Sequence, residues 1–184
     1  MGLYIVAVAA LFFLAFAFFA VGQASVVRNS AQTAADASAL AAARSARDDV
    51  KDAFNKALRE GDLPRLGDLL AGAGMQGAGA CEAAETMAVA NHADRQTCER
   101  VDGPPGYAVG VRTQGTVGKS VIEGTEDKHA VAHATAVVDP RCTVGPKNGK
   151  AITFTCNDAD VIVDPTASDF RLDLSLFYSV HLST

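Results

Sequence analysis

An unbroken apolar segment of nineteen residues, Leu3 to Val21, limits what this chain can fold into more than any other feature. As an α-helix it extends about 28 Å, close to the roughly 30 Å hydrocarbon thickness of a bilayer. Phenylalanines are spread around it, so it lacks the polar face expected of a helix in a soluble core. We therefore predict a transmembrane helix over residues 1–22. Removal as a secretory signal is the alternative, because the small residues that follow resemble a cleavage site.

The rest of the chain has the composition of an ordinary globular domain. Residues 23–184 carry all 16 basic and 21 acidic side chains, and the formal net charge is −5. About 160 residues are enough for one domain with its own core. The acidic balance and the lack of a basic cluster argue against nucleic acid as a partner.

Four cysteines lie beyond the apolar segment, and none of them has the short spacing of a zinc or thioredoxin motif. An even number without such a motif favours two disulfides formed in an oxidising compartment. The simplest pairing joins Cys81 to Cys98 and Cys142 to Cys156, since each bond closes a local loop. The alternative is four free thiols in a cytosolic domain. With disulfides, we expect a cytoplasmic N-terminus and an extracytoplasmic C-terminal domain.

An alanine-rich segment follows the predicted span and contains no proline before residue 61. Alanine strongly favours helix, so we predict that residues 23–60 continue the transmembrane helix as a stem, giving one helix of about 55 residues. At 100° per residue, small side chains form one helix-packing face. This face either packs under the chain's own head or packs against neighbouring helices in an assembly. Its members are Ala31, Ala35, Ala39, Ala42, Ala46, Val50, Ala53 and Ala57.

Residues 61–184 are predicted to form an extracytoplasmic α+β head. Short helices are expected within 63–72 and 81–98, and the DGPPG sequence at 102–106 is expected to mark the change from helix to strand. After it, apolar residues alternate, which predicts strands joined by short turns in an antiparallel sheet. The predicted strands are 107–113, 131–137, 151–156 or 161–163, and 170–182, with a short strand or hairpin loop over 117–129.

No combination of residues predicts catalysis, a cofactor or a metal site. The groups considered either lack an orienting partner, lack the ligand spacing of a known site, or fit a solvated turn. We therefore expect no enzyme activity, no cofactor and no metal. The groups are His129 with His133, Glu126 with Asp127 and His129, His92 with Asp94 and Cys98, the glycines from Gly72 to Gly79, and Asp158 with Asp160 and Asp164.

The N-terminal segment closely resembles TadE/TadG-like pilus-assembly proteins of actinobacteria, which are type IV pilin-like components of the Flp, or tight-adherence, system. The residues that carry the resemblance are the apolar segment, Gly22 to Ala24, Arg28 and Asn29, and the helix from Ala34 to Ala43. The stretches VGKSVIEGTE at 117–126 and ATAVVDPRC at 134–142 also resemble this family.

The resemblance implies a structural, non-catalytic subunit or assembly component of an extracytoplasmic pilus or secretion filament. Its partners would be the membrane and other pilin-like or Tad subunits, including copies of itself in a helical filament. The alternative is a monomeric, membrane-tethered binding protein. Processed pilins carry a glutamate at the fifth mature position, but a cut after Gly2 would place Ala7 there. The sequence therefore does not support such processing, unless the true start lies upstream.

Overall fold

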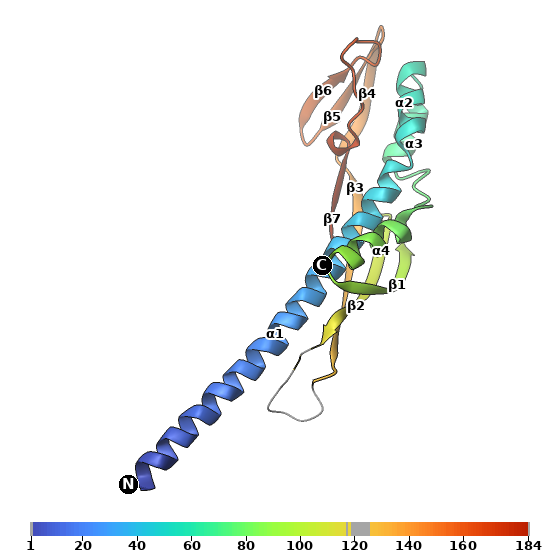
Figure 1. Cartoon of the computed structure of the whole chain (residues 1–184). Helices are drawn as coiled ribbons and strands as arrows, with labels where there is room; N and C mark the ends of the chain where they lie inside the picture. Colours follow the sequence, from blue (N-terminus) through green and yellow to red (C-terminus); the bar gives the residue numbers. More distant parts are fainter. Residues whose placement is uncertain (1, 117, 119–125, 184) are drawn as a thin grey trace.

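The structure is a computed structural model that describes all residues except 1, 117, 119–125 and 184. It confirms the predicted α+β class: a long N-terminal apolar helix is followed by short helices and antiparallel sheets (Figure 1). The first half of the long helix projects from the head, and the second half lies along it. The predicted strand or loop over 117–129 lies mostly outside the described residues.

Helix α1 runs from Gly2 to Asp48, so the apolar segment and the alanine-rich segment form one continuous helix. The expected helix of about 55 residues is nevertheless interrupted near its end. The amide of Val50 donates to the carbonyl of Arg47, three residues back, and the carboxylate of Asp49 accepts a hydrogen bond from the amide of Gly77. This turn separates α1 from α2, Lys51–Glu60, which ends at a left-handed Gly61.

Two further helices precede the strands. Helix α3, Leu63–Leu70, begins where the carboxylate of Asp62 accepts a hydrogen bond from the amide of Arg65, which is an N-cap. Helix α4, Ala80–Ala90, lies in the first part of the predicted range 81–98 and buries Ala80, Ala84 and Ala88. Both helices confirm the short helices expected from the sequence.

The larger sheet has four antiparallel strands in the order β1-β2-β3-β7. They are β1 (Ala93–Val101), β2 (Gly106–Thr116), β3 (His129–Pro140) and β7 (Tyr178–Leu182). The expected change from helix to strand at residues 102–106 is wrong, because β1 already precedes it. Strand β1 is a polar edge strand, ADRQTCERV, without the apolar alternation by which the other strands were predicted.

The smaller sheet has three antiparallel strands in the order β4-β5-β6, at the end of the molecule remote from the N-terminus (Figure 1). They are β4 (Cys142–Asn148), β5 (Ala151–Cys156) and β6 (Ala159–Val163). The strand predicted over 170–182 is shorter than expected, because the carboxylate of Asp173 caps a 3-10 turn, η1, at Leu174–Leu176. The single predicted sheet is therefore two sheets.

One core joins the helices to both sheets. Helix α1 packs against β3, β2 and α4, and α3 packs against β4. At the upper end of the core, the ring of Phe54 from α2 lies 4.8 Å from that of Phe177 and 6.3 Å from that of Phe154. The core thus includes residues on both sides of the predicted boundary at residue 61, and the domain limits themselves stay a prediction.

Candidate functional site

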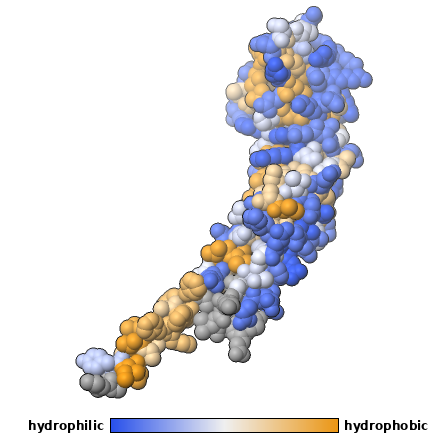
Figure 2. All heavy atoms as spheres, in the orientation of Figure 1, coloured by the Kyte–Doolittle hydropathy of each residue, from blue (hydrophilic) through white to orange (hydrophobic). Residues whose placement is uncertain are grey.

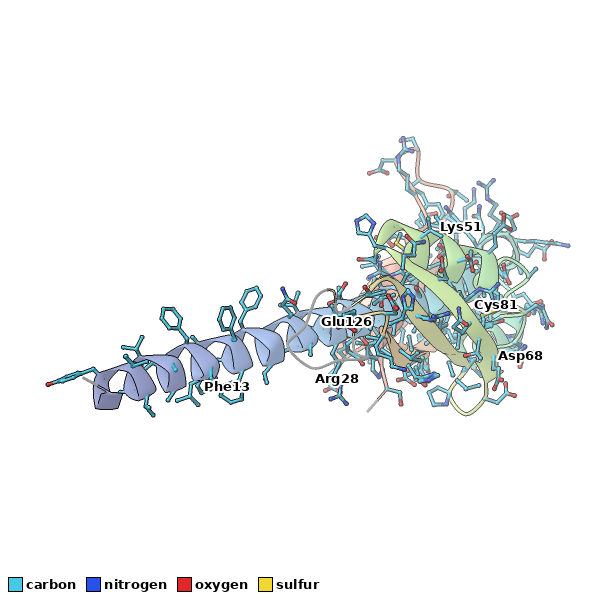
Figure 3. All side chains as sticks on the ribbon, turned by 60° about the horizontal axis from the view of Figure 1, so that its bottom comes forward. Phe13, Arg28, Lys51, Asp68, Cys81 and Glu126 are labelled. Atoms are coloured by element: carbon cyan, nitrogen blue, oxygen red, sulfur yellow. A yellow bond between two sulfur atoms is a disulfide. The ribbon has the colours of Figure 1, made fainter. Side chains whose placement is uncertain are left out.

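The first half of α1 has no covering structure in the described part of the chain. Every large apolar side chain described from Tyr4 to Val21 is at least 50% exposed, and Phe13 is 68% exposed. Figure 2 shows this apolar surface on the projecting helix, and Figure 3 shows its side chains extending outward all around it. An exposed apolar surface of this size needs lipid or other apolar helices around it.

This helix is long and apolar enough to cross a bilayer. Its most apolar stretch has a mean hydropathy of 2.7, and none of that stretch is buried. A helix satisfies its own backbone hydrogen bonds, so it can enter hydrocarbon without an unpaired amide or carbonyl. The first half of α1 is accordingly a membrane-associating segment.

Burial of α1 begins at Ala31, about ten residues past the end of the apolar segment. Of the eight residues of the predicted helix-packing face, seven are buried and Ala53 is partly buried. They lie under the chain's own head, where small side chains let α1 approach the sheet and α4 closely. Prediction from the sequence missed three more fully buried positions of α1: Ala34, Ser38 and Ala43.

There is a physical reason why prediction missed these three positions. Helix α1 is covered from two sides, by β2 and β3 and by α4, so its buried surface is wider than the single stripe expected from the sequence. Ala34 and Ala43 repeat the small-residue pattern and could have been found by widening that stripe. Ser38 lies as near to that stripe as Ala43, but its polar side chain argued against burial, and its hydroxyl is indeed buried without a hydrogen-bond partner among the described residues.

A polar notch lies where the exposed helix enters the head. It has a volume of about 400 Å³ and is lined by Ser25, Arg28, Asn29 and Gln32 of α1 and by Val131 and Ala132 of β3. Arg28 is the first charged residue after the apolar segment, and Figure 3 shows it at the base of the head. The sequence indicated only the α1 side of this site, because Arg28 is the first charged residue after the predicted span and Asn29 follows it.

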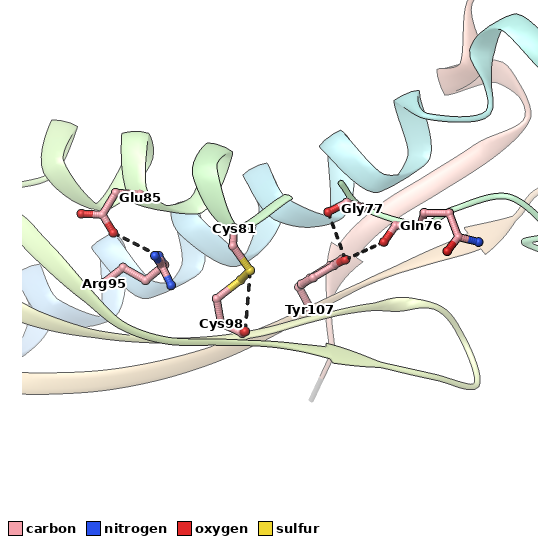
Figure 4. The surroundings of a disulfide bond; sticks show 7 residues. All are labelled: Gln76, Gly77, Cys81, Glu85, Arg95, Cys98 and Tyr107. Carbon is pink, nitrogen blue, oxygen red and sulfur yellow. Dashed lines mark hydrogen bonds and ion pairs between the residues drawn. A yellow bond between two sulfur atoms is a disulfide. The ribbon is translucent and has the colours of Figure 1, made fainter. Parts of the chain in front are cut away.

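Both predicted disulfides are present. Cys81 of α4 is bonded to Cys98 of the edge strand β1, and Cys142 of β4 is bonded to Cys156, which faces it on β5. Beside the first bond, the guanidinium of Arg95 is 3.0 Å from the carboxylate of Glu85, a second link between β1 and α4 (Figure 4). The two bonds brace the edge strand and the remote sheet respectively.

The glycine-rich loop before α4 is held by polar contacts from two directions. The carboxylate of Asp49 accepts hydrogen bonds from the amides of Gly77 and Ala78, at 2.6 and 3.4 Å. The hydroxyl of Tyr107 donates to the carbonyl of Gln76 at 3.2 Å (Figure 4). The loop is therefore a connection tied to the head, and its amides at 77 and 78 already have an acceptor.

Several of the polar groups considered for chemistry are engaged in structural contacts. The disulfide uses Cys98, His129 Nδ1 lies 2.7 Å from the carbonyl of Thr113, and Asp160 accepts from the hydroxyl of Thr155. Hydrogen bonds from the hydroxyl and amide of Thr166 hold the pKa of Asp164 below its ordinary value. Among the residues that the structure describes, no three His, Cys, Asp or Glu residues gather as metal ligands would.

The N-terminal segment matches a known protein family. Residues 2–45 match the family described as Flp pilus-assembly TadE/G-like. The match covers the exposed apolar half of α1 and most of its buried half, and it confirms the predicted resemblance for this segment. The actinobacterial origin stays a prediction. No curated protein matches the chain. No solved structure matches it either.

Proposed function

With a pilus-assembly match over residues 2–45 as the premise, we propose that this chain is a non-catalytic, pilin-like subunit or assembly component of an extracytoplasmic Tad/Flp-type pilus or secretion filament. The single observation that carries the proposal is that the matched segment includes the whole apolar half of α1, whose surface is not covered by any of the residues that the structure describes. Such a surface is suited to residence in a bilayer first and to packing with apolar helices of other subunits afterwards.

The alanine face supports a rigid connection between this helix and the head. Because the alanines of this face are buried under the chain's own strands and α4, the head cannot swing freely about the helix without exposing its core. A subunit of this kind would carry its head into an assembly at a fixed angle to the helix. Contacts with sister subunits would then be made by the exposed residues before Ala31.

The disulfides support the extracytoplasmic placement of the head and the cytoplasmic placement of the N-terminus. Disulfides form and persist in oxidising compartments, and both bonds lie beyond the apolar segment. Alkylation of intact cells followed by nonreducing electrophoresis tests this placement. We expect a mobility that changes on reduction, and free thiols at all four cysteines would contradict it.

Site-specific photocrosslinking tests the assembly role. A photoreactive phenylalanine analogue at Phe13, on the exposed helix, is expected to give crosslinks to other pilus-assembly subunits or a ladder of copies of this chain. The matched control carries the analogue at Arg44, which is also exposed on α1 but lies beside the head. Surface-sheared material is probed for the chain in parallel.

The alternative function is a monomeric, membrane-tethered binding protein. It predicts crosslinks from Phe13 to lipid alone, and a chain that stays in the detergent-soluble membrane fraction as a monomer. That combination of results would exclude both the subunit and the assembly-component roles. Release of the chain from membranes into the soluble fraction by alkaline carbonate would exclude membrane anchoring itself.

A further inference from the structure

We infer that the polar notch around Arg28 binds the phosphate of an anionic lipid headgroup in the leaflet on the side of the head. The inference rests on the anchoring of α1 in a membrane, as proposed above, but not on assembly into a filament. It concerns the four polar residues of α1 that line the notch, Ser25, Arg28, Asn29 and Gln32.

The position of Arg28 along α1 sets its depth. Arg28 follows Val21 by seven residues, so its Cα lies about 10 Å beyond the end of the apolar segment. Each headgroup layer extends roughly 5–7 Å past the hydrocarbon. Helical side chains tilt toward the N-terminus, which for α1 is the direction of the membrane. The long side chain of Arg28 therefore directs its guanidinium back to the level of the lipid phosphates.

The charge of Arg28 is available for a ligand. None of the ion pairs formed by the described residues includes Arg28. The nearest acidic group on the same helix, Asp36, lies two turns further from the membrane and accepts a hydrogen bond from the side chain of Gln32 at 2.8 Å. A guanidinium offers two parallel N–H donors that match a phosphate, so an exposed arginine without an ion pair among the described residues is suited to binding a phosphate.

The remaining walls of the notch suit a lipid better than a freely diffusing anion. Ser25 and Asn29 supply neutral polar groups beside Arg28, and Val131 on β3 is 55% exposed at the same site. Val26 on α1, next to these residues, is 70% exposed. The glycerol and ester carbons of a lipid would contact the apolar surface while its phosphate contacts the polar one, whereas inorganic phosphate would contact only the polar one.

Lipid co-purification tests the inference on the full chain. The protein is reconstituted in vesicles of equal parts phosphatidylglycerol and phosphatidylcholine, extracted in mild detergent, and its retained phospholipids are quantified by mass spectrometry. Wild type should retain phosphatidylglycerol over phosphatidylcholine by about fivefold, the factor equivalent to about 1 kcal/mol for one surface cation. R28Q should lower this ratio to near one, and R28K should restore part of it.

Two controls make the outcome decisive. R44Q removes an exposed arginine from the same helix, sixteen residues further from the membrane, and should leave the ratio unchanged. Thermal unfolding of each variant shows whether the head is intact. If R28Q lowers the unfolding temperature, the lipid ratio of R28K is compared with that of wild type instead. An unchanged ratio in R28Q, or full displacement of the lipid by a wash with inorganic phosphate, overturns the inference. If wild type shows the expected lipid ratio but is never found in filaments or crosslinked to other subunits, that result counts against the proposed function alone.

Discussion

The phenolic hydroxyl of Tyr178 donates a hydrogen bond of 2.9 Å to the backbone carbonyl of Leu69, joining the last strand to α3 across 109 residues of sequence. The bond is buried, and the ring of Tyr178 packs at 6.3 Å from that of Phe54. It therefore links the sheet, α2 and α3 at one point.

Tyr178→Phe removes this bond but keeps the ring. The carbonyl of Leu69 still accepts from the amide of Gly72, so we expect a loss of only about 1 kcal/mol in the free energy of unfolding. Tyr178→Leu, which also removes the ring contact, should cost more. Urea unfolding in detergent, followed by circular dichroism, measures both. Equal stabilities for wild type and Tyr178→Phe would contradict a role for the hydroxyl.

Burial also makes the head sensitive to alkaline pH, because it raises the pKa of Tyr178 well above its ordinary value near 10. Above pH 10 the unfolded chain ionises this phenol while the folded chain keeps it protonated. The unfolded state then binds fewer protons, so stability falls as pH rises. We expect the free energy of unfolding to decline from about pH 10 upward, and less steeply in Tyr178→Phe. Parallel pH profiles for the two proteins would refute this assignment.

The carboxylate of Asp49 fixes the glycine-rich loop to the turn between α1 and α2. Asp49→Ala removes the acceptor for the amides of Gly77 and Ala78, so we expect these amides to exchange with solvent at least severalfold faster. Hydrogen exchange with mass spectrometry measures the effect. Asp48→Ala is the matched control, because Asp48 pairs with Arg47 and has no described contact with the loop. Equal protection in both variants would contradict the link.

Local patterns in the sequence predicted the parts of the fold that local physics determines. The apolar segment, the helix stop at Gly61, the loop-closing cysteine pairs and the buried face from Ala31 to Ala57 all depend on composition or spacing within a short window. Strand β1 escaped prediction because an edge strand can be polar, and its pairing with β2 is a tertiary property.

The interruption of α1 and the notch at Arg28 also lay beyond local patterns. At the turn of Asp49 and Val50, the carboxylate of Asp49 accepts hydrogen bonds from the amides of a loop almost thirty residues later. The notch exists only because β3 returns beside α1, which brings Val131 and Ala132 to residues a hundred positions earlier. Helical periodicity carries no information about either contact.

Ser38 provides a test of packing along α1. Its side chain is fully buried, and its hydroxyl has no hydrogen-bond partner among the described residues. A buried hydroxyl without a partner costs about 1–3 kcal/mol, so Ser38→Ala should raise the free energy of unfolding by about 1 kcal/mol or more. Ser30→Ala, at an exposed position of the same helix, should gain only the few tenths that helix propensity supplies. A gain no larger at Ser38 than at Ser30 would show that the hydroxyl is satisfied.

The two disulfides should differ in what they protect, although each closes a loop of similar length, with separations of 17 and 14 residues. Chain entropy predicts a loss of about 3 kcal/mol when either pair is replaced by serine. Cys142 and Cys156 face each other on strands that stay paired by their backbone, so local exchange in β4 and β5 should change little. Cys81 and Cys98 instead join a helix to an edge strand that is paired on one side only.

Replacing Cys81 and Cys98 by serine should therefore accelerate hydrogen exchange in β1 and α4 far more than in β5. The ion pair between Arg95 and Glu85 is partly exposed and too weak to compensate for the lost bond. Reduction of both disulfides in wild type should lower the free energy of unfolding by as much as the two pairs of serine substitutions together. If exchange in β1 is unchanged in the Cys81→Ser, Cys98→Ser protein, pairing with β2 alone is sufficient to hold the edge strand, and the disulfide acts only on the unfolded chain.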